Sequence, residues 1–380
     1  MADTMFFSRD TKVFVAPLNS AGAEQAVFEI PVLDGFSFAQ ATNATEITLN
    51  EMGNGTSRRG RKMFNDSLAP AEWSFSTYAR PFKSAGSDTA GNASRDGTTR
   101  HHAVEEVLWA MMVGDAAYTV TTDSVAPAFT GLSADATDLD ITFANSNKAQ
   151  LGKANIYFTL GSTSSDNGGT ITYKIANCCV NEAGLDFDID GIATINWSGM
   201  GTIITEQASA PTGTAVNEKV GDTGNFIRNR LTELVASSTS PTSVGTYALT
   251  LTGGSITISN NMTFLTPETL GVVNTPLDHV TGTRSVSGSF TCYLSSTADS
   301  SMDLFENLIE GTSTVTNDFN LTFKVGGASN TPRLELAMTH CHLEVPTHSI
   351  EDVISLEANF HALGSDIDST DELTIKYVGA

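Results

Sequence analysis

The sequence predicts an α+β protein, mainly antiparallel β, made of two tandem copies of one domain, each with one short flanking α-helix. Ser, Thr, Asn and Gly are abundant, whereas long helical stretches rich in Leu, Glu, Lys and Ala are scarce, which favours short strands joined by polar turns. Similar segments also occur in the same order in the two halves of the chain, which indicates an internal repeat.

The composition limits the function. The chain has 380 residues and 40% of them are hydrophobic, so it can form two domains with buried cores. Its formal net charge of −23 argues against a conventional DNA-binding domain, which uses Lys and Arg to contact phosphates. Neither a secretory signal nor an apolar run of transmembrane length is recognisable, so we expect synthesis in a cytoplasm and no membrane partner.

Two hairpins and two strands form the first matching pairs of segments. Alternating residues on both sides of Asp34-Gly35 predict a hairpin, and Gly253-Gly254 in the second half is flanked in the same way. The segment Ser74–Tyr78 is matched by Ser289–Tyr293, and both predict strands.

A short amphipathic helix is predicted in each half. The first has a narrow apolar stripe and ends at Gly114, and the second repeats the spacing and ends at Gly311. We expect side chains from these stripes, with two aromatic residues described below, to lie in the core: Val107, Leu108, Met111, Phe305, Leu308, Trp197 and Phe360.

The last match is the longest and sets the domain boundaries. Residues 176–201 align without gaps with residues 339–364, so that Trp197 corresponds to Phe360. We therefore expect a first domain over residues 1–206 and a second over 245–380, joined by a linker over 207–244 with a short helix at 225–236. The first copy is longer, which predicts an insertion at about 116–153 with strands at 118–122 and 139–143.

Signatures of catalysis or metal binding are missing from the sequence. No nucleophile elbow, phosphate-binding loop or HExxH helix occurs, so we expect no catalytic residue, no metal, no cofactor and no enzyme activity. Asp186-Phe187-Asp188 begins like a calcium loop, but its twelfth position is Trp197 instead of Glu. We interpret these aspartates as acidic residues that alternate on one strand face, exposed to water or to a lumen. The histidine pairs His101-His102 and His340-x-His342 are interpreted as surface or interface residues, and the four cysteines as buried thiols in a reducing compartment.

One basic cluster stands out in this acidic chain. Arg58, Arg59, Arg61 and Lys62 follow a glycine-rich segment between two strands of the first copy, and the equivalent segment 271–279 has no such cluster. The cluster could bind nucleic acid, form a solvated flexible loop, or contact a protein. We favour a contact with an acidic neighbour, such as another copy of this chain.

The order of elements resembles the tail tube proteins of tailed bacteriophages. This resemblance rests on the early hairpin, the long loop, the single short helix and the late strand ending near Ile195-Asn196-Trp197-Ser198-Gly199. The tandem copies resemble the siphophage subgroup with two fused tube domains. The resemblance implies sandwich-like domains whose inner sheets join edge to edge between subunits, and rings that stack into a hollow tube.

The resemblance also implies partners and a location. A fused pair of domains would form trimeric, pseudo-hexameric rings, and the long loop with Arg58, Arg59, Arg61 and Lys62 would contact the adjacent ring. The tube would conduct double-stranded DNA during ejection and meet the tape measure, tail tip or baseplate, and terminator proteins of a virion tail. An acidic lumen would repel DNA and let it slide, and Glu46, Glu51 and Glu72 are the candidate lumen residues.

Other classes of protein stay open at this point. A baseplate, terminator or decoration protein of a virion, or an adhesin, would share the β-rich composition. A carbohydrate-active enzyme would require two carboxyl groups about 5–10 Å apart in a cleft.

Overall fold

The computed structural model describes most of the chain as an antiparallel β protein with two α-helices. The described residues are 6–24, 26–47, 61–83, 100–113, 131–143, 151–161, 170–211, 225–238, 246–266, 276–310, 318–327, 332–350 and 352–379. Their antiparallel pairing confirms the prediction of a mainly antiparallel β protein with few helices.

The elements of the first half precede residue 208. They are β1 (Lys12–Pro17), β2 (Phe28–Ile30), β3 (Ser37–Ile47), β4 (Lys62–Tyr78), β5 (Pro81–Lys83), β6 (His101–Ala103), α1 (Glu106–Val113), β7 (Leu132–Ala134), β8 (Asp138–Thr142), β9 (Ala154–Leu160), β10 (Ile171–Asp188), β11 (Thr194–Gly201) and β12 (Ile204–Gln207).

The elements of the second half begin after a 3₁₀ turn at Asn229–Leu231. They are β13 (Glu233–Ser238), β14 (Thr246–Ala248), β15 (Leu251–Ser259), β16 (Thr263–Phe264), β17 (His279–Val280), β18 (Ser285–Tyr293), α2 (Ser301–Glu310), β19 (Phe319–Val325), β20 (Arg333–Leu343), β21 (Thr347–Ser349), β22 (Ser355–Ala362) and β23 (Thr374–Val378).

The two halves pair their strands in the same order. In the first half the neighbours run β3–β4–β11–β10–β9–β1–β2. In the second half they run β15–β18–β22–β20–β19–β13–β14. Each helix follows the second strand of its series, which places α1 after β4 and α2 after β18.

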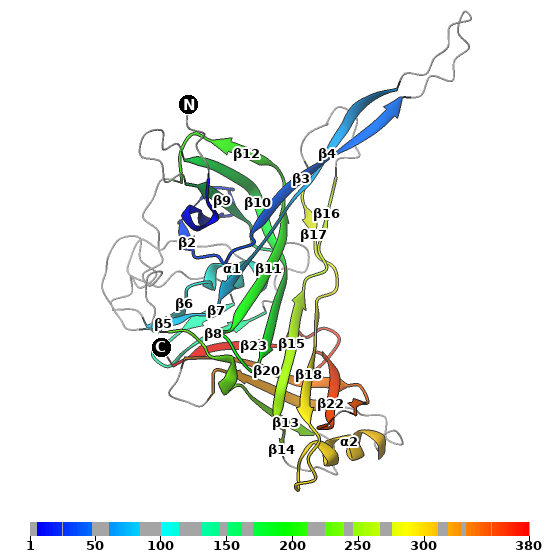
Figure 1. The fold of residues 1–380 in the computed structure, drawn as a ribbon. Coiled ribbons are helices and arrows are strands. Elements are labelled where there is room, and N and C mark those ends of the chain that lie inside the picture. Colours follow the sequence, from blue (N-terminus) through cyan, green and yellow to red (C-terminus); the bar gives the residue numbers. More distant parts are fainter. Residues whose placement is uncertain are drawn as a thin grey trace, which may run out of the picture.

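Two further pairings join the halves. The C-terminal part of β10 pairs with β15, from Glu182 opposite Ser259 to Asp188 opposite Gly253. One continuous sheet therefore runs β3–β4–β11–β10–β15–β18–β22 (Figure 1). On the opposite side of the core, β8 pairs with the late strand β23.

Strand β10 belongs to two sheets. Its N-terminal part pairs with β9 and β12, and its C-terminal part pairs with β11 and β15. The change occurs near Asn177, whose φ of 50° lies in the left-handed region that asparagine tolerates better than most residues. The register also shifts there, between Ile175 and Cys178, as expected where a bulge turns a strand.

The core lies on one face of the continuous sheet. Every residue of α1 is buried, and the Trp109 ring meets Trp197 edge-on with 4.8 Å between centroids. In the second half Phe360 packs against Phe323, with 5.5 Å between centroids. Of the expected core residues, Val107, Leu108, Met111, Trp197, Leu308 and Phe360 are buried, and Phe305 packs half-buried at the edge of the core.

The strand and helix predictions are confirmed, but the hairpins are wrong. Segments 74–78 and 289–293 lie in β4 and β18, and both helices occur where the apolar stripes predict them. At Asp34-Gly35 the chain does turn, but β2 pairs with β1 whereas β3 pairs with β4. Gly253-Gly254 lies inside β15 and not in a turn. A Cβ at Gly254 would come within 2.7 Å of the Phe187 ring, which accounts for glycine at this position of the strand.

The expected linker helix is also wrong. Residues 233–238 form β13, which pairs with β19 and β14. Leu234 and Ala236 point into the core with the two-residue period of a strand. In the expected insertion, β8 (Asp138–Thr142) corresponds in sequence to the predicted strand at 139–143. The other predicted strand, at 118–122, lies outside the described residues.

Candidate functional site

The continuous sheet has one face that the core does not cover, which we call the open face. On β10, buried Ala183, Leu185 and Phe187 alternate with Glu182, Gly184, Asp186 and Asp188. The same alternation on the neighbouring strands places mostly small polar side chains beside them. The open face comprises Ser37, Ala39, Ala41, Glu72, Ser74, Ser76, Tyr78, Glu182, Gly184, Asp186, Asp188, Thr194, Asn196, Ser198, Met200, Gly253, Ser255, Thr257, Ser287, Ser289, Thr291, Tyr293, Ser355, Glu357, Asn359 and His361.

Hydrogen bonds run across the strands on this face. The Ser76 hydroxyl donates to Asn196 Oδ1 at 2.6 Å, and Asn196 Nδ2 donates to Asp186 Oδ2 at 3.2 Å. Next to the second-half strands, Asn359 Nδ2 donates to Glu344 Oε2 at 2.9 Å. These bonds hold the polar side chains in place and leave hydroxyl and carboxylate oxygens toward solvent.

The open face is acidic: it has carboxylate side chains but neither Lys nor Arg. The strand segments 37–47, 71–78, 182–188, 194–201, 251–259, 285–293 and 355–362 contain no Lys or Arg. Five carboxylates lie on it: Glu72, Glu182, Asp186, Asp188 and Glu357. The exposed alternation of Asp186 and Asp188 confirms the interpretation of that segment as an acidic strand face.

The structure places two of the three candidate lumen carboxylates, Glu72 and Glu46. Glu72 is on the open face, but Glu46 pairs with Arg61 at 3.4 Å at the far end of β3 and β4. Glu51 lies outside the described residues. Glu182 and Glu357 were not among the expected lumen residues, although each alternates with buried neighbours on its strand.

β3 and β4 extend beyond the sheet as a two-stranded arm, which comprises residues 42–47 and 61–68 (Figure 1). Arg61 and Lys62 are on this arm, and Arg58 and Arg59 fall outside the described residues. The arm also exposes apolar side chains, with Met63 at 63% and Phe64 at 47%. An exposed ribbon that carries both cations and apolar groups is suited to a protein contact.

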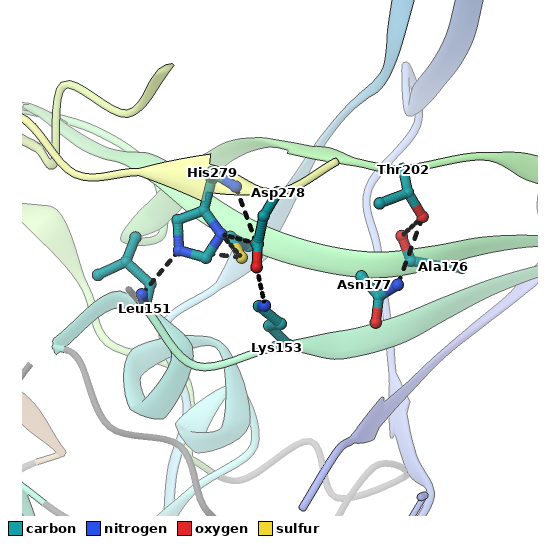
Figure 2. A network of polar contacts seen from close by, with 8 residues as sticks. Leu151, Lys153, Ala176, Asn177, Thr202, Asp278 and His279 are labelled. Atoms are coloured by element: carbon teal, nitrogen blue, oxygen red, sulfur yellow. Dashed lines mark hydrogen bonds and ion pairs between the residues drawn. The ribbon is translucent and has the colours of Figure 1, made fainter. Parts of the chain in front are cut away.

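Buried Cys179 and His279 lie together with the half-buried Asp278 at the start of β17, and Figure 2 shows Asp278 and His279. Cys179 Sγ is 3.3 Å from His279 Nδ1, which is 3.0 Å from Asp278 Oδ1. His279 Nε2 accepts the Leu151 backbone N–H at 2.7 Å, so the ring proton is on Nδ1 and faces Asp278. Burial raises the pKa of the Cys179 thiol well above its ordinary value and lowers the pKa of His279. Hence Cys179 is not an activated nucleophile.

This network has a structural role instead. Asp278 and His279 belong to the connection between β15 and β18 (residues 260–284), and Lys153 Nζ meets Asp278 Oδ2 at 2.6 Å (Figure 2). Asn260 Nδ2 adds bonds to the carbonyl oxygens of Met112 and Val180. The second-half connection is thereby seated on the first half.

A second buried polar cluster fixes β23 to α1. Tyr377 OH donates to Glu105 Oε1 at 2.5 Å, and Trp109 Nε1 donates to Tyr377 OH at 2.7 Å. The Arg80 backbone N–H also donates to Glu105, at 3.2 Å. Desolvation by burial raises the pKa of Glu105 to about 7. These residues lie inside the protein and offer no surface to a substrate.

The described residues show neither a metal site nor a helix that could span a membrane. Within the described ranges, no three His, Cys, Asp or Glu side chains are grouped in a way that could hold a metal ion. Neither helix of that part of the chain has the length and apolarity of a membrane span.

The comparison with known proteins decides the family. A model of the family described as phage tail tube protein matches residues 33–362. The chain belongs to the phage tail tube protein family. It is also 31% identical over 371 residues to tail tube protein pb6 of Escherichia phage T5, an alignment that covers 96% of this chain and 74% of that protein. Membership makes this tail tube family protein a structural component of the virion tail.

Proposed function

We propose that this tail tube family protein assembles into stacked, trimeric, pseudo-hexameric rings that form a hollow tube and conduct double-stranded DNA during ejection. The observation that carries the proposal is the open face, a continuous sheet surface of small polar and acidic side chains without Lys or Arg. Such a surface lines a channel well, because it stays hydrated and offers no cation to phosphates.

The charge of the open face suits passage rather than binding of DNA. Duplex DNA carries one negative charge per about 1.7 Å of axis, and each phosphate neutralised by a cation strengthens binding. A lumen lined by Glu72, Glu182, Asp186, Asp188 and Glu357 would repel the phosphates and let the duplex slide. DNA is then a transient passenger without a specific site.

The repeated strand order supports three chains in each ring. If the units at about residues 1–206 and 245–380 are two tube domains, three chains supply six domains. We place the insertion at about 116–153 within the first unit, with its β8 paired with β23. Of the expected linker at 207–244, residues 233–238 form β13, which pairs with β19 and β14 and so extends the second unit toward its N-terminus. The arm, with Arg61 and Lys62 and the neighbouring Arg58 and Arg59, would contact the adjacent ring.

The remaining partners follow from the family resemblance. We propose contacts with the tape measure, tail tip or baseplate, and terminator proteins, synthesis in the host cytoplasm, and no cofactor or enzyme activity. The burial of Cys179 and His279 is consistent with the last point, because this pair is closed to a substrate.

Negative-stain electron microscopy of the purified protein, over a range of salt and protein concentrations, tests the function. We expect hollow tubes with a regular axial repeat, and end-on averages with sixfold features made by three chains. Single rings that never stack would contradict the tube and favour a terminator or baseplate role. Persistent monomers at high concentration, also in the presence of tail-tip extract, would contradict self-assembly altogether.

The lumen charge has its own test. The variant Glu182→Lys, Asp186→Lys and Glu357→Lys should form tubes that retain short duplex DNA in a salt-sensitive way, because each cation releases counterions on contact with phosphate. Cosedimentation of labelled duplex with tubes should rise about tenfold or more at low salt and vanish at high salt. The control carries the same charge change off the open face, as Glu206→Lys, Glu306→Lys and Asp368→Lys. Equal DNA retention by both variants would place the lumen on another surface.

A further inference from the structure

A short 3₁₀ turn precedes the same strand in each half of the chain. One turn, Ser8–Asp10, ends two residues before β1 begins, and the other, Asn229–Leu231, ends two residues before β13 begins. β1 and β13 also hold the same place in the two strand series, paired with β9 and β19 respectively. Residues 6–9 of the first half therefore correspond without a gap to residues 227–230 of the second half.

In the second half, the segment at this turn is docked on the first half. We call residues 226–230 the docked segment. The Ala193 backbone N–H donates to the Ile227 carbonyl oxygen at 2.9 Å, and Arg228 forms an isolated antiparallel bridge with Ile192. Ile227 is fully buried by this contact and by its own half. The docked segment thus lies along the turn between β10 and β11.

Side chains of the docked segment add to this backbone pairing. The Phe226 ring meets Tyr78, the last residue of β4, edge-on with 5.3 Å between centroids. The Arg80 guanidinium lies 5.4 Å from the centroid of the same Phe226 ring. At the surface, Arg230 lies 3.5 Å from Asp190. Apolar and charged groups therefore hold the segment together.

The surface that receives the docked segment has a counterpart in the second half. β18 ends at Tyr293 opposite the first residue of β22, as β4 ends opposite the first residue of β11. Just beyond these ends, the Leu294 N–H donates to the Ile354 carbonyl oxygen at 3.0 Å. The same bond in the first half runs from the Ala79 N–H to the Ala193 carbonyl oxygen, at 2.9 Å. Ile354 therefore holds the place of Ala193.

At this counterpart the structure has a hollow of about 720 Å³. It is lined by Thr252, Tyr293, Ile350, Asp352, Val353 and Ser355. Counting back from Ile354, Val353 holds the place of Ile192, which bridges to the docked segment in the first half. Ile350 is 80% exposed and Val353 is 60% exposed. The hollow thus presents apolar side chains and one carboxylate, Asp352, at the place where the first half receives a segment.

Residues 6–9 are the counterpart of the docked segment and are exposed. Phe6 and Phe7 are each 41% exposed. The Arg9 side chain is 73% exposed beside Asp10, with its guanidinium 5.1 Å from the Phe7 ring centroid. Figure 1 shows β2 and β9, the partners of β1, far from β22, so this segment does not reach the hollow of its own chain. Its aromatic and cationic groups match an apolar hollow with a carboxylate.

We propose that residues 6–9 of one copy occupy the hollow of a second copy. Phe7 then lies opposite Val353, and Arg9 reaches Asp352. The contact repeats between copies what the docked segment does within the chain, and it involves no pairing of the outer strands of the sheet. Each copy supplies one segment and one hollow, so the contact is head-to-tail. The inference rests on the proposed ring assembly and adds to it a docking segment and the site that receives it.

Removing the aromatic side chains tests the docking segment. Phe6→Ser with Phe7→Ser should raise the protein concentration needed for half-maximal ring assembly by about tenfold or more, because the hollow loses its apolar contacts. Circular dichroism should not change, since both side chains are exposed in the free chain. Leu363→Ser with Ile367→Ser removes two exposed apolar side chains beyond the other end of β22 and is the control, which should assemble normally. Sedimentation velocity gives the assembled fraction.

Charge exchange tests the ion pair. Arg9→Glu and Asp352→Arg should each weaken assembly severalfold, because like charges then face each other in the hollow. The combined variant should restore assembly toward that of the wild type. Asp368→Arg, at an exposed site, is the charge-matched control for Asp352→Arg and should assemble normally.

Cysteine cross-linking tests the position of the segment. All four native cysteines are buried, so new surface thiols react without competition. The variant Phe7→Cys with Val353→Cys should form intermolecular disulfides under mild oxidation, because these residues are the counterparts of the bridged pair Arg228 and Ile192. A mixture of the two single variants should give linked pairs of chains only. Phe7→Cys with Ile367→Cys, whose second site is almost fully exposed, is the control and should not cross-link.

The outcomes separate this inference from the proposed function. Wild-type tubes together with normal assembly of the Phe6→Ser, Phe7→Ser variant, or with no cross-link between positions 7 and 353, would overturn the docking site and leave the tube function standing. Cross-linked chains without any rings or tubes from the wild type would retain the docking site and count against the proposed function.

Discussion

Replacing Gly288 with alanine is expected to abolish stable folding of the second half. A Cβ at this position of β18 would lie 2.0 Å from the Ser255 carbonyl oxygen and 2.7 Å from the Phe360 ring. Both neighbours are held in the sheet and the core, so neither can move away at low cost. We expect a loss of about 4 kcal/mol or more in the free energy of unfolding, in the range of severe core overpacking. Urea unfolding followed by tryptophan fluorescence and circular dichroism measures it.

Gly184→Ala is the matched control for this prediction. Gly184 also lies in the middle of a strand of the continuous sheet, but a Cβ there would meet only Asn196 Cβ, at 3.9 Å. We expect this variant to be as stable as the wild type or slightly more stable, since alanine restricts the unfolded chain. Equal losses in the two variants would show that the packing of β18 against β15 and β22 is not as tight as described.

The free energy of unfolding of the wild type is expected to fall between pH 4.5 and pH 7, and replacing Glu105 with a neutral residue should remove much of this fall. Burial raises the pKa of Glu105 from 4.5 to about 7 in the folded protein. As the pH rises through this window, the unfolded chain releases the proton while the folded chain keeps it, so the free energy of unfolding falls. This difference between the pKa of Glu105 in the unfolded and in the folded state corresponds to ~3 kcal/mol of stability, which is fully lost once the pH exceeds the folded pKa.

The variant Glu105→Gln keeps a neutral side chain of the same size and so should flatten this part of the profile. Urea unfolding at several pH values between 4 and 8.5 gives the difference between wild type and variant, which cancels the contributions of His101 and His279. Asp368→Asn, at an exposed site, should leave the slope unchanged. If the wild type and Glu105→Gln run parallel, the carboxyl group ionises in the folded state as readily as in water.

Local patterns in the sequence predict the parts of this fold that depend on local chemistry. The stripe of α2 and the alternation of Asp186 and Asp188 around Phe187 each reflect a single element with one buried side. The stripe of α1 predicts a helix at the right place, but that helix is buried on all sides and is not amphipathic. The order of matched segments also anticipates the repeated strand order. These features need no knowledge of which strand lies next to which.

The errors arise where a distant neighbour decides the local structure. Gly253-Gly254 has the composition of a turn, but Phe187 of β10 occupies the space that a side chain at Gly254 would need. Residues 233–238 satisfy a weak helical spacing, yet pairing with β19 makes them a strand. Asp34-Gly35 does turn the chain, but the sequence does not reveal that the strands on either side join different neighbours.

The candidate site shows the same limit. Glu46 and Glu72 lie on neighbouring strands and look alike in sequence, but β3 and β4 leave the sheet between them, so only Glu72 reaches the open face. The contact of Lys153 with Asp278 and that of Tyr377 with Glu105 each join residues more than a hundred positions apart. No local pattern could have indicated either of them.

The pairing of β10 with β15 inside one chain also changes the kinetics of any closed assembly that such chains form. This pairing is made when the chain folds, at an effective concentration set by the intervening polypeptide and not by the amount of protein in solution. If such chains close into the proposed rings, only the contacts between molecules would depend on collisions. The covalent link would then lower the reaction order of ring closure, and with it the threshold concentration for assembly.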